Sequence, residues 1–455
     1  MTAQGNQDCA GAVIVGAGLA GLTAARKLMS EDHNVTVLEA RDRVGGRTLD
    51  YTLADGERID LGGQWIGPTQ DHVQELIEEF NLETARQYDD GNGQLAVEGT
   101  VSEHDEALQA LPAESLSELM DAFGQIETLR EQIPLDAPYN APNAEEWDAI
   151  TIESWKAETL ETEAARAAFD TVLRALFTTE PADMSFLYFL FYIHAAGGVE
   201  PITSVEGGAQ ERRIVDGAQQ LSQLLADELG EAVYLEAPVR AITQDDNGVA
   251  VDADGGTYAG SYVIVAIPPT LAGRITYDPP LPARRDALTQ RMPMGSAIKC
   301  VATYEAPFWR NDGYSGFVLV DDGVVGFIFD DTPADSTMGA LVGFIVANKA
   351  RTWSERDASE RRENVLEDFT RYFGVQAAEP LEYVDQAWTN EPWSAGCYAG
   401  NMTPGTMTGY GEVLREPVGR IYWAGTETAT QWCGYMDGAI QSGKRAAREV
   451  SERLT

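Results

Sequence analysis

The feature that most restricts the fold of this 455-residue chain is a glycine-rich turn close to its start. Ala12-Val13-Ile14-Val15 is a continuous apolar run, typical of a buried parallel strand, and Gly16-Ala17-Gly18-Leu19-Ala20-Gly21 leads from it into a helix predicted through Leu28. A second predicted strand, Val35 to Leu38, ends at Glu39. Glycines permit the tight turn, helix amides face a pyrophosphate, and the acid accepts from a ribose hydroxyl. An ordinary strand-to-helix turn explains the glycines alone, but both strands and Glu39 favour a dinucleotide site.

The residues after Glu39 favour a flavin over a nicotinamide cofactor. Arg41 and Arg47 flank the pair Gly45-Gly46 and can neutralise a diphosphate that lies across the turn. The alternative is a basic surface loop with a glycine turn. The run from Leu61 to Trp65 is again glycine-rich, as expected where backbone passes close to a planar ligand or in an ordinary turn.

Length and charge limit the class of protein. A chain of this length predicts two domains. The formal net charge of −41 arises from 73 acidic residues against 32 basic ones, and it disfavours nucleic acid and anionic membranes as partners. High salt would screen such a charge, so we expect the protein to reside in the cytoplasm of a salt-adapted organism. The alternative explanation of the negative charge is that it steers a cationic substrate to the protein. No apolar run is long enough for a membrane span, and the first residues do not resemble a signal peptide.

Cysteine and histidine usage excludes several enzyme classes. Cys9, Cys300, Cys397 and Cys433 lack the spacing of a metal site or a disulfide framework, which indicates a reducing compartment. None of the 4 histidines lies in a nucleophile or metal-binding pattern. The sequence therefore predicts no metal site and no serine hydrolase.

Two tyrosines and a cysteine lie close together in the C-terminal part of the sequence. Gly396-Cys397-Tyr398 and Gly434-Tyr435-Met436 bracket the segment 424 to 428. The two phenol rings offer electron-rich faces for an amine, and the thiol can tether a reactive group covalently.

Lys299 is conspicuous because lysine is rare in this chain. It lies in Ala297-Ile298-Lys299-Cys300-Val301-Ala302, which predicts an interior strand, where an ammonium group is costly unless it has a partner or loses its proton. An edge strand with Lys299 in solvent is the alternative.

The motifs together resemble the flavin-containing amine oxidases. The resemblance rests on the glycine fingerprint at 16 to 21, Glu-Ala-Arg-Asp-Arg-Val-Gly-Gly-Arg-Thr at 39 to 48, Gly-Pro-Thr-Gln at 67 to 70 and Ala-Gly-Thr-Glu-Thr-Ala-Thr at 424 to 430. It is greatest to the monoamine oxidases, through Gly-Gly-Ala-Gln-Glu-Arg at 207 to 212 and Gly-Ser-Ala-Ile-Lys-Cys at 295 to 300. The resemblance covers nearly the whole chain, but it does not include the membrane-anchoring C-terminal helix of the mitochondrial members.

The resemblance implies an α/β fold in which a Rossmann-like FAD-binding domain is interleaved with an α+β substrate-binding domain. The FAD-binding domain would comprise residues 1–82, 215–289 and 391–455, and the substrate-binding domain residues 83–214 and 290–390. Further strands are expected at 234–240 and 262–266, and helical periodicity marks 114–129.

The resemblance also implies the site residues. Lys299 would face flavin N5 through a water and assist reoxidation by dioxygen, while Tyr398 and Tyr435 would enclose the amine. Cys397 would join FAD covalently; the alternatives are noncovalent FAD, with Cys397 a buried hydrophobe, or attachment at Cys433. The other implied cofactor-binding residues are Gly16, Gly18, Ala20, Gly21, Glu39, Arg41, Gly46, Arg47, Gly63, Gln64, Val239, Trp388, Gly425, Thr426, Glu427 and Met436. The implied substrate pocket contains Trp65, Leu176, Phe177, Thr203, Gln210, Phe327 and Phe344.

The implied activity is oxidation of an amine by dioxygen, which gives an imine, then aldehyde and ammonia, and hydrogen peroxide. The implied pocket contains no acid, which favours primary arylalkyl or alkyl monoamines because a second ammonium would lack a partner. A diamine or polyamine oxidase, an amino-acid oxidase and a flavin desaturase are the alternatives within this fold, and a non-catalytic flavoprotein would have no need of Lys299. The expected partners are the amine and dioxygen, with no membrane anchor; the resemblance also allows for a homodimer.

Overall fold

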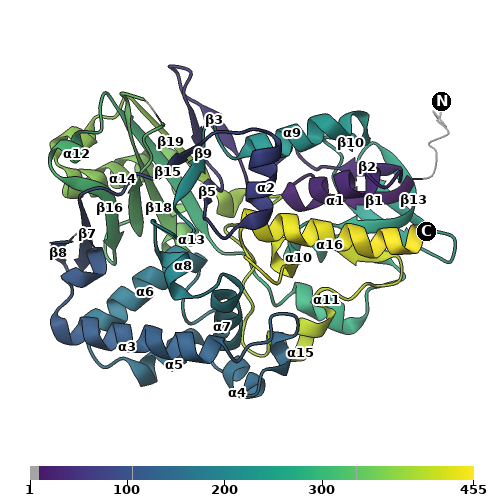
Figure 1. Ribbon diagram of the computed structural model, residues 1–455, viewed down its shortest axis with the longest axis horizontal. Coiled ribbons are helices and arrows are strands. Elements are labelled where there is room, and N and C mark those ends of the chain that lie inside the picture. The colour runs from purple at the N-terminus through teal and green to yellow at the C-terminus, as the bar shows by residue number, and fades with distance from the viewer. Residues whose placement is uncertain (1–9, 105, 335) are drawn as a thin grey trace.

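The computed structural model describes residues 10–104, 106–334 and 336–455, so Cys9 lies outside the described residues. Two large β-sheets lie beside each other, and a group of helices lies below them (Figure 1). The first sheet is built from segments that are far apart in the sequence. Its strands, in spatial order, are β10 (Val233–Tyr234), β2 (Val35–Leu38), β1 (Ala10–Val15), β13 (Gly256–Val265), β12 (Val249–Ala253), β11 (Val239–Gln244) and β14 (Thr276–Asp278), with β20 (Ile421–Trp423) also paired to β13.

The predicted βαβ unit is present in this first sheet. β1 lies parallel to both β2 and β13, and its apolar residues are buried on both faces. Helix α1 (Leu19–Met29) starts directly after the glycine turn, and the last helix, α16 (Met436–Leu454), packs alongside it (Figure 1). The first and last helices therefore lie side by side next to the glycine turn.

The strand expected over 234–240 is interrupted. β10 ends at Tyr234 and β11 begins at Val239, because Glu236 has φ 53°, a left-handed conformation that no strand continues through. The intervening backbone instead bonds to the end of β2: the amide of Glu236 donates to Arg41 O and that of Ala237 to Glu39 O, both at 2.8 Å. This turn places Val239 next to the Glu39 segment.

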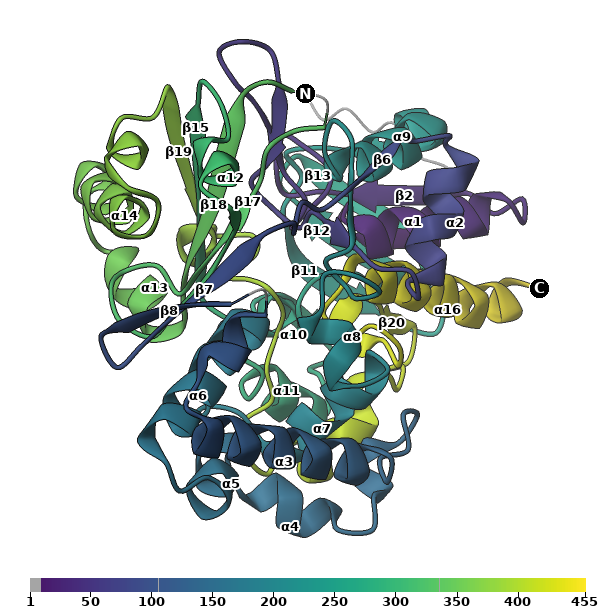
Figure 2. The ribbon, with the colours of Figure 1, turned by 60° about the vertical axis from the view of Figure 1, so that its left-hand side comes forward.

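The second sheet contains Lys299. Its order is β19 (Glu382–Ala387), β15 (Ala297–Tyr304), β18 (Gly339–Val346), β17 (Phe327–Asp330), β16 (Tyr314–Val320), β7 (Asn92–Val97) and β8 (Thr100–His104). Because β15 pairs on both sides, with β18 and β19, the edge-strand alternative for Lys299 is wrong. Figure 2 shows α13 (Ala347–Trp353) and α14 (Ala358–Phe373) on the outer side of this sheet.

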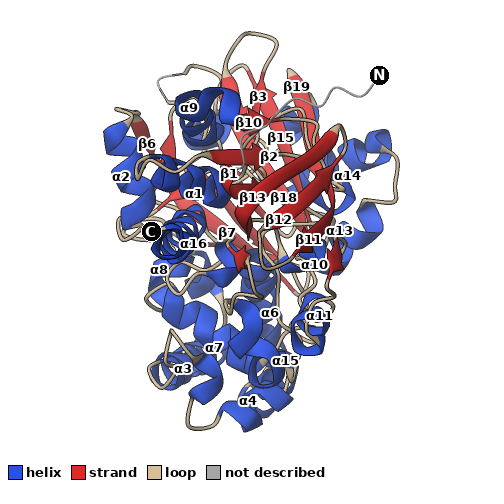
Figure 3. Ribbon diagram, turned by 90° about the vertical axis from the view of Figure 1, so that its right-hand side faces the viewer, coloured by secondary structure: helices blue, strands red, loops and turns tan. Residues whose placement is uncertain are grey.

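The lower part of the molecule is helical (Figure 3). α3 (Ala113–Arg130) covers the predicted helical stretch, and α7 (Phe186–Ala195) is buried on nearly every side, which explains its almost wholly apolar sequence. The other helices of this group are α4 (Ala144–Ala149), α5 (Ile152–Thr159), α6 (Glu163–Phe177) and α8 (Val199–Thr203). Helices outside it are α2 (Asp71–Glu79), α9 (Gln219–Leu229), α10 (Pro269–Ala272), α11 (Ala283–Thr289), α12 (Phe308–Asn311) and α15 (Thr406–Tyr410).

The other two sheets are small. β3 (Asp50–Thr52) pairs with β4 (Arg58–Asp60), and β9 (Arg212–Ile214) lies between β5 (Trp65–Ile66) and β6 (Thr84–Arg86). Among the described residues, no helix combines the length and apolar character needed to cross a membrane.

Candidate active site

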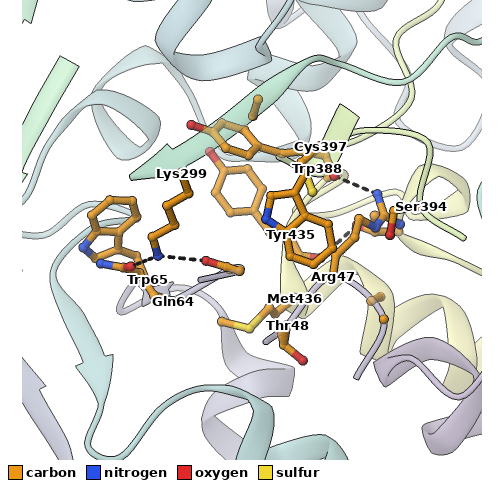
Figure 4. A pocket seen from close by; sticks show the side chains of 18 of the residues that line it. Arg47, Thr48, Gln64, Trp65, Lys299, Trp388, Ser394, Cys397, Tyr435 and Met436 are labelled. Atoms are coloured by element: carbon orange, nitrogen blue, oxygen red, sulfur yellow. Dashed lines mark hydrogen bonds between the residues drawn. The ribbon is translucent and has the colours of Figure 1, made fainter. Parts of the chain in front are cut away.

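One continuous cavity of about 1000 Å³ extends from the glycine turn of the first sheet to the apolar side of the second. Most of the predicted site residues line it, and Figure 4 shows part of this lining. Those that do so are Gly16, Gly18, Ala20, Glu39, Arg41, Gly46, Arg47, Gly63, Gln64, Trp65, Leu176, Thr203, Gln210, Val239, Lys299, Phe327, Phe344, Trp388, Cys397, Tyr398, Gly425, Thr426, Tyr435 and Met436. Gly21, Phe177 and Glu427 lie outside the lining.

The glycine turn is shaped by close contacts between backbones. A Cβ at Gly21 would lie 1.9 Å from Gly16 O, so Gly21 allows α1 to pack against the turn and does not itself face the cavity. Gly18 is the N-cap of α1 and offers no side chain to its first amides. Those amides carry the positive end of the helix dipole and are free to bind an anion.

The acid at the end of β2 lies where the pattern predicts. Glu39 is buried, and its carboxylate accepts hydrogen bonds from Ala17 N at 2.8 Å and Arg41 N at 3.0 Å. Arg41 donates to Ser394 Oγ at 2.8 Å, while its Nε is buried without a partner in the protein. The segment thus combines one acidic and one basic group at the cavity wall.

Cys397 and Cys433 occupy different environments. Cys397 is 6% exposed, lines the cavity, and is held by hydrogen bonds from its amide to Gly295 O and from Thr178 Oγ1 to its carbonyl, at 3.1 and 2.6 Å. Cys433 is fully buried beside the Tyr188 hydroxyl and lies outside the cavity lining. Burial raises the pKa of both thiols to about 12. Position, and not acidity, therefore distinguishes the two cysteines.

Tyr398 and Tyr435 come from separate segments that meet at the cavity. Tyr398 follows Cys397, and Tyr435 is the N-cap of α16, with Thr426 Oγ1 donating to Tyr435 O at 2.8 Å. The ring of Tyr398 packs against Phe344 and that of Tyr435 against Trp432. Burial raises the pKa of both phenols, so both rings stay neutral and electron-rich.

Lys299 projects from β15 to the cavity wall. Its Nζ donates to Gly62 O at 3.0 Å and to Gln64 Oε1, and both bonds are drawn in Figure 4. The rings of Trp65 and Phe344 lie 5.9 and 5.7 Å from Nζ. Burial lowers the pKa of Lys299, while the carboxylates of Asp331, Asp60 and Asp50 oppose that shift.

Two predicted contacts are displaced from the cavity surface. Phe177 packs edge-on against Phe189 and Tyr192, behind the cavity wall. Its neighbour Leu176 lines the cavity instead, because successive residues at the end of α6 face different sides of the helix. Glu427 is buried behind the wall, where it pairs with Arg47 at 2.6 Å. Arg47, and not Glu427, faces the cavity.

The expectation of a lining without acids is wrong. Asp89, Glu106 and Glu206 also line the cavity; Glu106 and Glu206 are exposed, and Arg86 pairs with Glu206 at 3.4 Å. They come from loops between elements, where no periodicity or motif marks them.

Other lining residues that sequence reasoning missed are Tyr192, Phe317, Phe329, Trp393 and Ser394. Tyr192, Phe317 and Phe329 lie on a helix or on strands whose burial was predictable, but their direction toward a cavity was not, and Trp393 lies in a turn.

A comparison with known families identifies the family of this chain. The sequence model described as "Flavin containing amine oxidoreductase" matches residues 19–451. The chain belongs to this family. It is 42% identical over 445 residues to a probable flavin-containing monoamine oxidase A of Dictyostelium discoideum, covering 97% of each chain.

Solved structures of other amine oxidases are similar to this amine oxidoreductase over nearly its whole length. A putrescine oxidase bound to putrescine superposes with a TM-score of 0.93 at 33% identity, with 98% of this chain and 99% of that chain covered. A cyclohexylamine oxidase from Brevibacterium oxydans gives a TM-score of 0.93 at 33% identity with the same coverage. These likenesses show the amine oxidase fold.

The site of this amine oxidoreductase fits FAD. The free amides of α1, the unpaired Arg41 Nε and the carboxylate of Glu39 match a pyrophosphate and a ribose. At Gly63 a Cβ would meet nothing within 4 Å, so this backbone borders open space where a flat ring can lie close. Within the described ranges, no group of histidine, cysteine and acidic side chains has the arrangement of a metal site.

Proposed function

We propose that this flavin-containing amine oxidoreductase oxidises primary arylalkyl or alkyl monoamines, with dioxygen as the electron acceptor and hydrogen peroxide as a product. The observation that carries the proposal is the position of Tyr398 and Tyr435 at one cavity with Lys299 and the dinucleotide turn. When bound, FAD supplies the two-electron acceptor for the amine and then passes the electrons to dioxygen.

The residues around the cavity would bind and orient the reactants. Tyr398 and Tyr435 hold the amine between two electron-rich rings, and Trp65, Phe327 and Phe344 bury its carbon skeleton. Lys299, on the wall of the same cavity, would hold a water beside a bound flavin and would assist its reaction with dioxygen. The N-terminus of α16 lies at the cavity wall, where its positive dipole end would stabilise negative charge on a bound flavin. By this proposal, orientation of the amine and the electronics of the cofactor would contribute most of the rate.

We also propose that Cys397 attaches FAD covalently. The support is its place in the cavity wall, in contrast to Cys433, which lies outside it. Acid precipitation of the yellow holoenzyme tests the bond: colour should stay in the pellet of the wild type and of Cys433→Ala, and should leave with the supernatant for Cys397→Ala. Colour in the wild-type supernatant would refute covalent attachment.

The division into an FAD-binding domain of residues 1–82, 215–289 and 391–455 and a substrate-binding domain of residues 83–214 and 290–390 is part of this proposal. Its support is that strands of the first sheet come only from the former segments and strands of the second only from the latter. We also propose, from the net charge of −41, that the protein resides in the cytoplasm of a salt-adapted organism.

A diamine oxidase is the second candidate function. Asp89, Glu106 and Glu206 on the cavity wall can pair with a distal ammonium group. A putrescine oxidase among the structural relatives is consistent with this candidate.

A peroxide assay separates the two candidates. Benzylamine and tyramine should give peroxide at kcat/KM values well above that of putrescine if the enzyme is a monoamine oxidase, and the order should reverse for a diamine oxidase. No peroxide from any of the three would contradict both. Lys299→Met is the control for the oxygen step, because it should slow peroxide formation without abolishing anaerobic bleaching of the flavin by the amine.

A further inference from the structure

A chain of buried side chains connects Lys299 to Asp331 through Gln64. Lys299 Nζ donates to Gln64 Oε1, and Gln64 Nε2 donates to Asp331 Oδ1 at 2.9 Å. Each of the three residues is at most 2% exposed. Figure 4 shows Lys299 and Gln64 at the cavity. Gln64 accepts a hydrogen bond from the amine and donates one to the carboxylate, so this one amide couples the Lys299 amine electrostatically to the Asp331 carboxylate.

The hydrogen bonds of Lys299 leave one donor for the cavity. An ammonium group has three donors. Two of them are occupied by Gly62 O and Gln64 Oε1, which belong to one short segment between β4 and β5. Since Lys299 also lines the cavity, the remaining donor is available to a water or to dioxygen on that side.

Asp331 is held more firmly than a surface carboxylate. Arg213 Nη1 donates to Asp331 Oδ1 at 2.5 Å and to its carbonyl at 3.1 Å, and the Asp331 amide donates to Ala340 O at 2.7 Å. Gln64 therefore bonds to a fixed acceptor, and the flexible lysine side chain acquires a fixed direction.

We propose that Gln64 and Asp331 are positioning residues, which hold the Lys299 amine toward the cavity for the reaction of the reduced flavin with dioxygen. The inference rests on the function proposed above for Lys299. It assigns Gln64 a role beyond contact with the cofactor, and Asp331 a role that no sequence motif indicated.

The same chain affects the charge of Lys299. Burial lowers its pKa, Asp331, Asp60 and Asp50 raise it, and Arg213 lowers it. Loss of the Asp331 carboxylate should therefore lower the pKa further and leave less ammonium at a given pH. The positive form is the one that stabilises the charge dioxygen gains on accepting an electron. Reoxidation should then decline at a lower pH in Asp331→Asn.

Competitive acetylation of the holoenzyme measures this pKa without any turnover. The chain has few lysines, and the exposed Lys27 and Lys444 serve as internal references for acetic anhydride labelling, read by mass spectrometry. In Asp331→Asn the labelling midpoint of Lys299 should move down by about one pH unit, a tenfold change in the ratio of charged to neutral amine at a given pH. The matched control is Asp330→Asn, a buried carboxylate that binds Trp309 and Arg310 and should leave the midpoint unchanged.

Reoxidation is measured after chemical reduction of the flavin, so that no amine substrate is needed. The rate constant for reoxidation by dioxygen should begin to fall at a pH about one unit lower in Asp331→Asn than in the wild type. Gln64→Leu should move this pH in the same direction. Gln94→Leu is the control, because Gln94 is an equally buried amide that donates to Tyr372 O, remote from Lys299.

Three results would overturn the inference. One is an unchanged Lys299 midpoint in both Asp331→Asn and Gln64→Leu, and another is an equal shift in Asp330→Asn or Gln94→Leu. The third is an unaltered reoxidation rate in Lys299→Met, which would remove the role of Lys299 as well. Failure of the amines to reduce the flavin would instead contradict the proposed function, and it would leave these measurements intact.

Discussion

Arg47 and Glu427 form a two-pronged ion pair, with Nη1 to Oε1 at 2.6 Å and Nη2 to Oε2 at 3.2 Å. The carboxylate also accepts from Gly400 N, and Arg47 Nη1 donates to Tyr398 O at 2.7 Å. One buried acid thus joins the segment after β2, the Cys397–Tyr398 loop and the segment that precedes α16. Glu427 supports the cavity wall from behind, through Arg47 and the Cys397–Tyr398 loop that face the cavity.

Glu427→Gln should weaken flavin retention. Removing the charge leaves Arg47 with a weaker partner in a largely buried place, so unfolding free energy should fall by roughly 3 kcal/mol and more flavin should separate on gel filtration. Glu412→Gln is the control, because its pair with Arg284 is exposed and should contribute less than about 1 kcal/mol. Equal losses in both variants, measured by urea unfolding, would contradict the supporting role of Glu427.

Thr203→Ile should narrow the range of accepted amines. Thr203 lies at the exposed end of α8 on the cavity lining, where its hydroxyl donates to Val199 O at 2.9 Å. Isoleucine adds bulk at the entrance, so KM should rise several-fold for branched arylalkylamines and little for benzylamine. Thr128→Ile on α3 is the matched control, since Thr128 makes the same kind of bond to Gly124 O. An unchanged substrate profile would show that Thr203 does not limit entry.

Asp60→Asn should reduce the loss of stability as pH rises from about 4 to about 8. Burial, with the neighbouring Asp50 and Asp331 carboxylates, raises the pKa of Asp60 to about 8, although Lys299 opposes the shift. Because the folded-state pKa exceeds the unfolded-state value, folding retains a proton. That contribution is complete below about pH 4 and is lost as pH rises through about 8.

The measurement is the unfolding free energy of Asp60→Asn and wild type across that pH range. The variant should release up to one proton fewer on unfolding, so its stability should decline less steeply with pH. Asp121→Asn, at an exposed position of α3, removes the same formal charge without the burial. If Asp121→Asn flattens the curve equally, then overall charge and not the setting of Asp60 controls it.

Salt should stabilise the protein through screening of its negative charge. At a net charge of −41, raising KCl from about 0.1 to about 2 M shortens the Debye length from about 10 Å to below 3 Å, and Tm should rise by several degrees. Sucrose at equal osmolality is the comparison. A rise in sucrose as large as that in KCl would indicate solute exclusion from the surface instead of charge screening.

Local patterns were sufficient for the dinucleotide unit and for several elements. Apolar runs of strand length, a glycine turn and helical periodicity depend on neighbours in sequence, so β2, the start of α1 and the extent of α3 were predictable. The strand expected at 234–240 is interrupted between Tyr234 and Val239, because Glu236 turns the chain toward Arg41 and Glu39. Such long-range backbone bonds leave no periodic signal.

The candidate site divides in the same way. Cys397, Tyr398 and Tyr435 stood out by residue type and by their family resemblance, and the structure brings them to one cavity. Whether a predicted contact faces that cavity depended on side-chain direction: Leu176 lines it, and Phe177 points behind it. Asp89 and Glu206 reach the wall from loops whose course no local pattern reveals.

The sequence by itself determined the glycine turn, the acid that follows β2, the rarity of lysine and the pair of tyrosines, because these are properties of residue type and local spacing. Only the tertiary structure decided what Lys299 touches. Gln64 and Asp331 are separated from each other by 267 residues in the sequence. Gln64 can bond to both Lys299 and Asp331 because the second sheet packs against the segment between β4 and β5. A buried ammonium needs such partners, and packing alone supplies them.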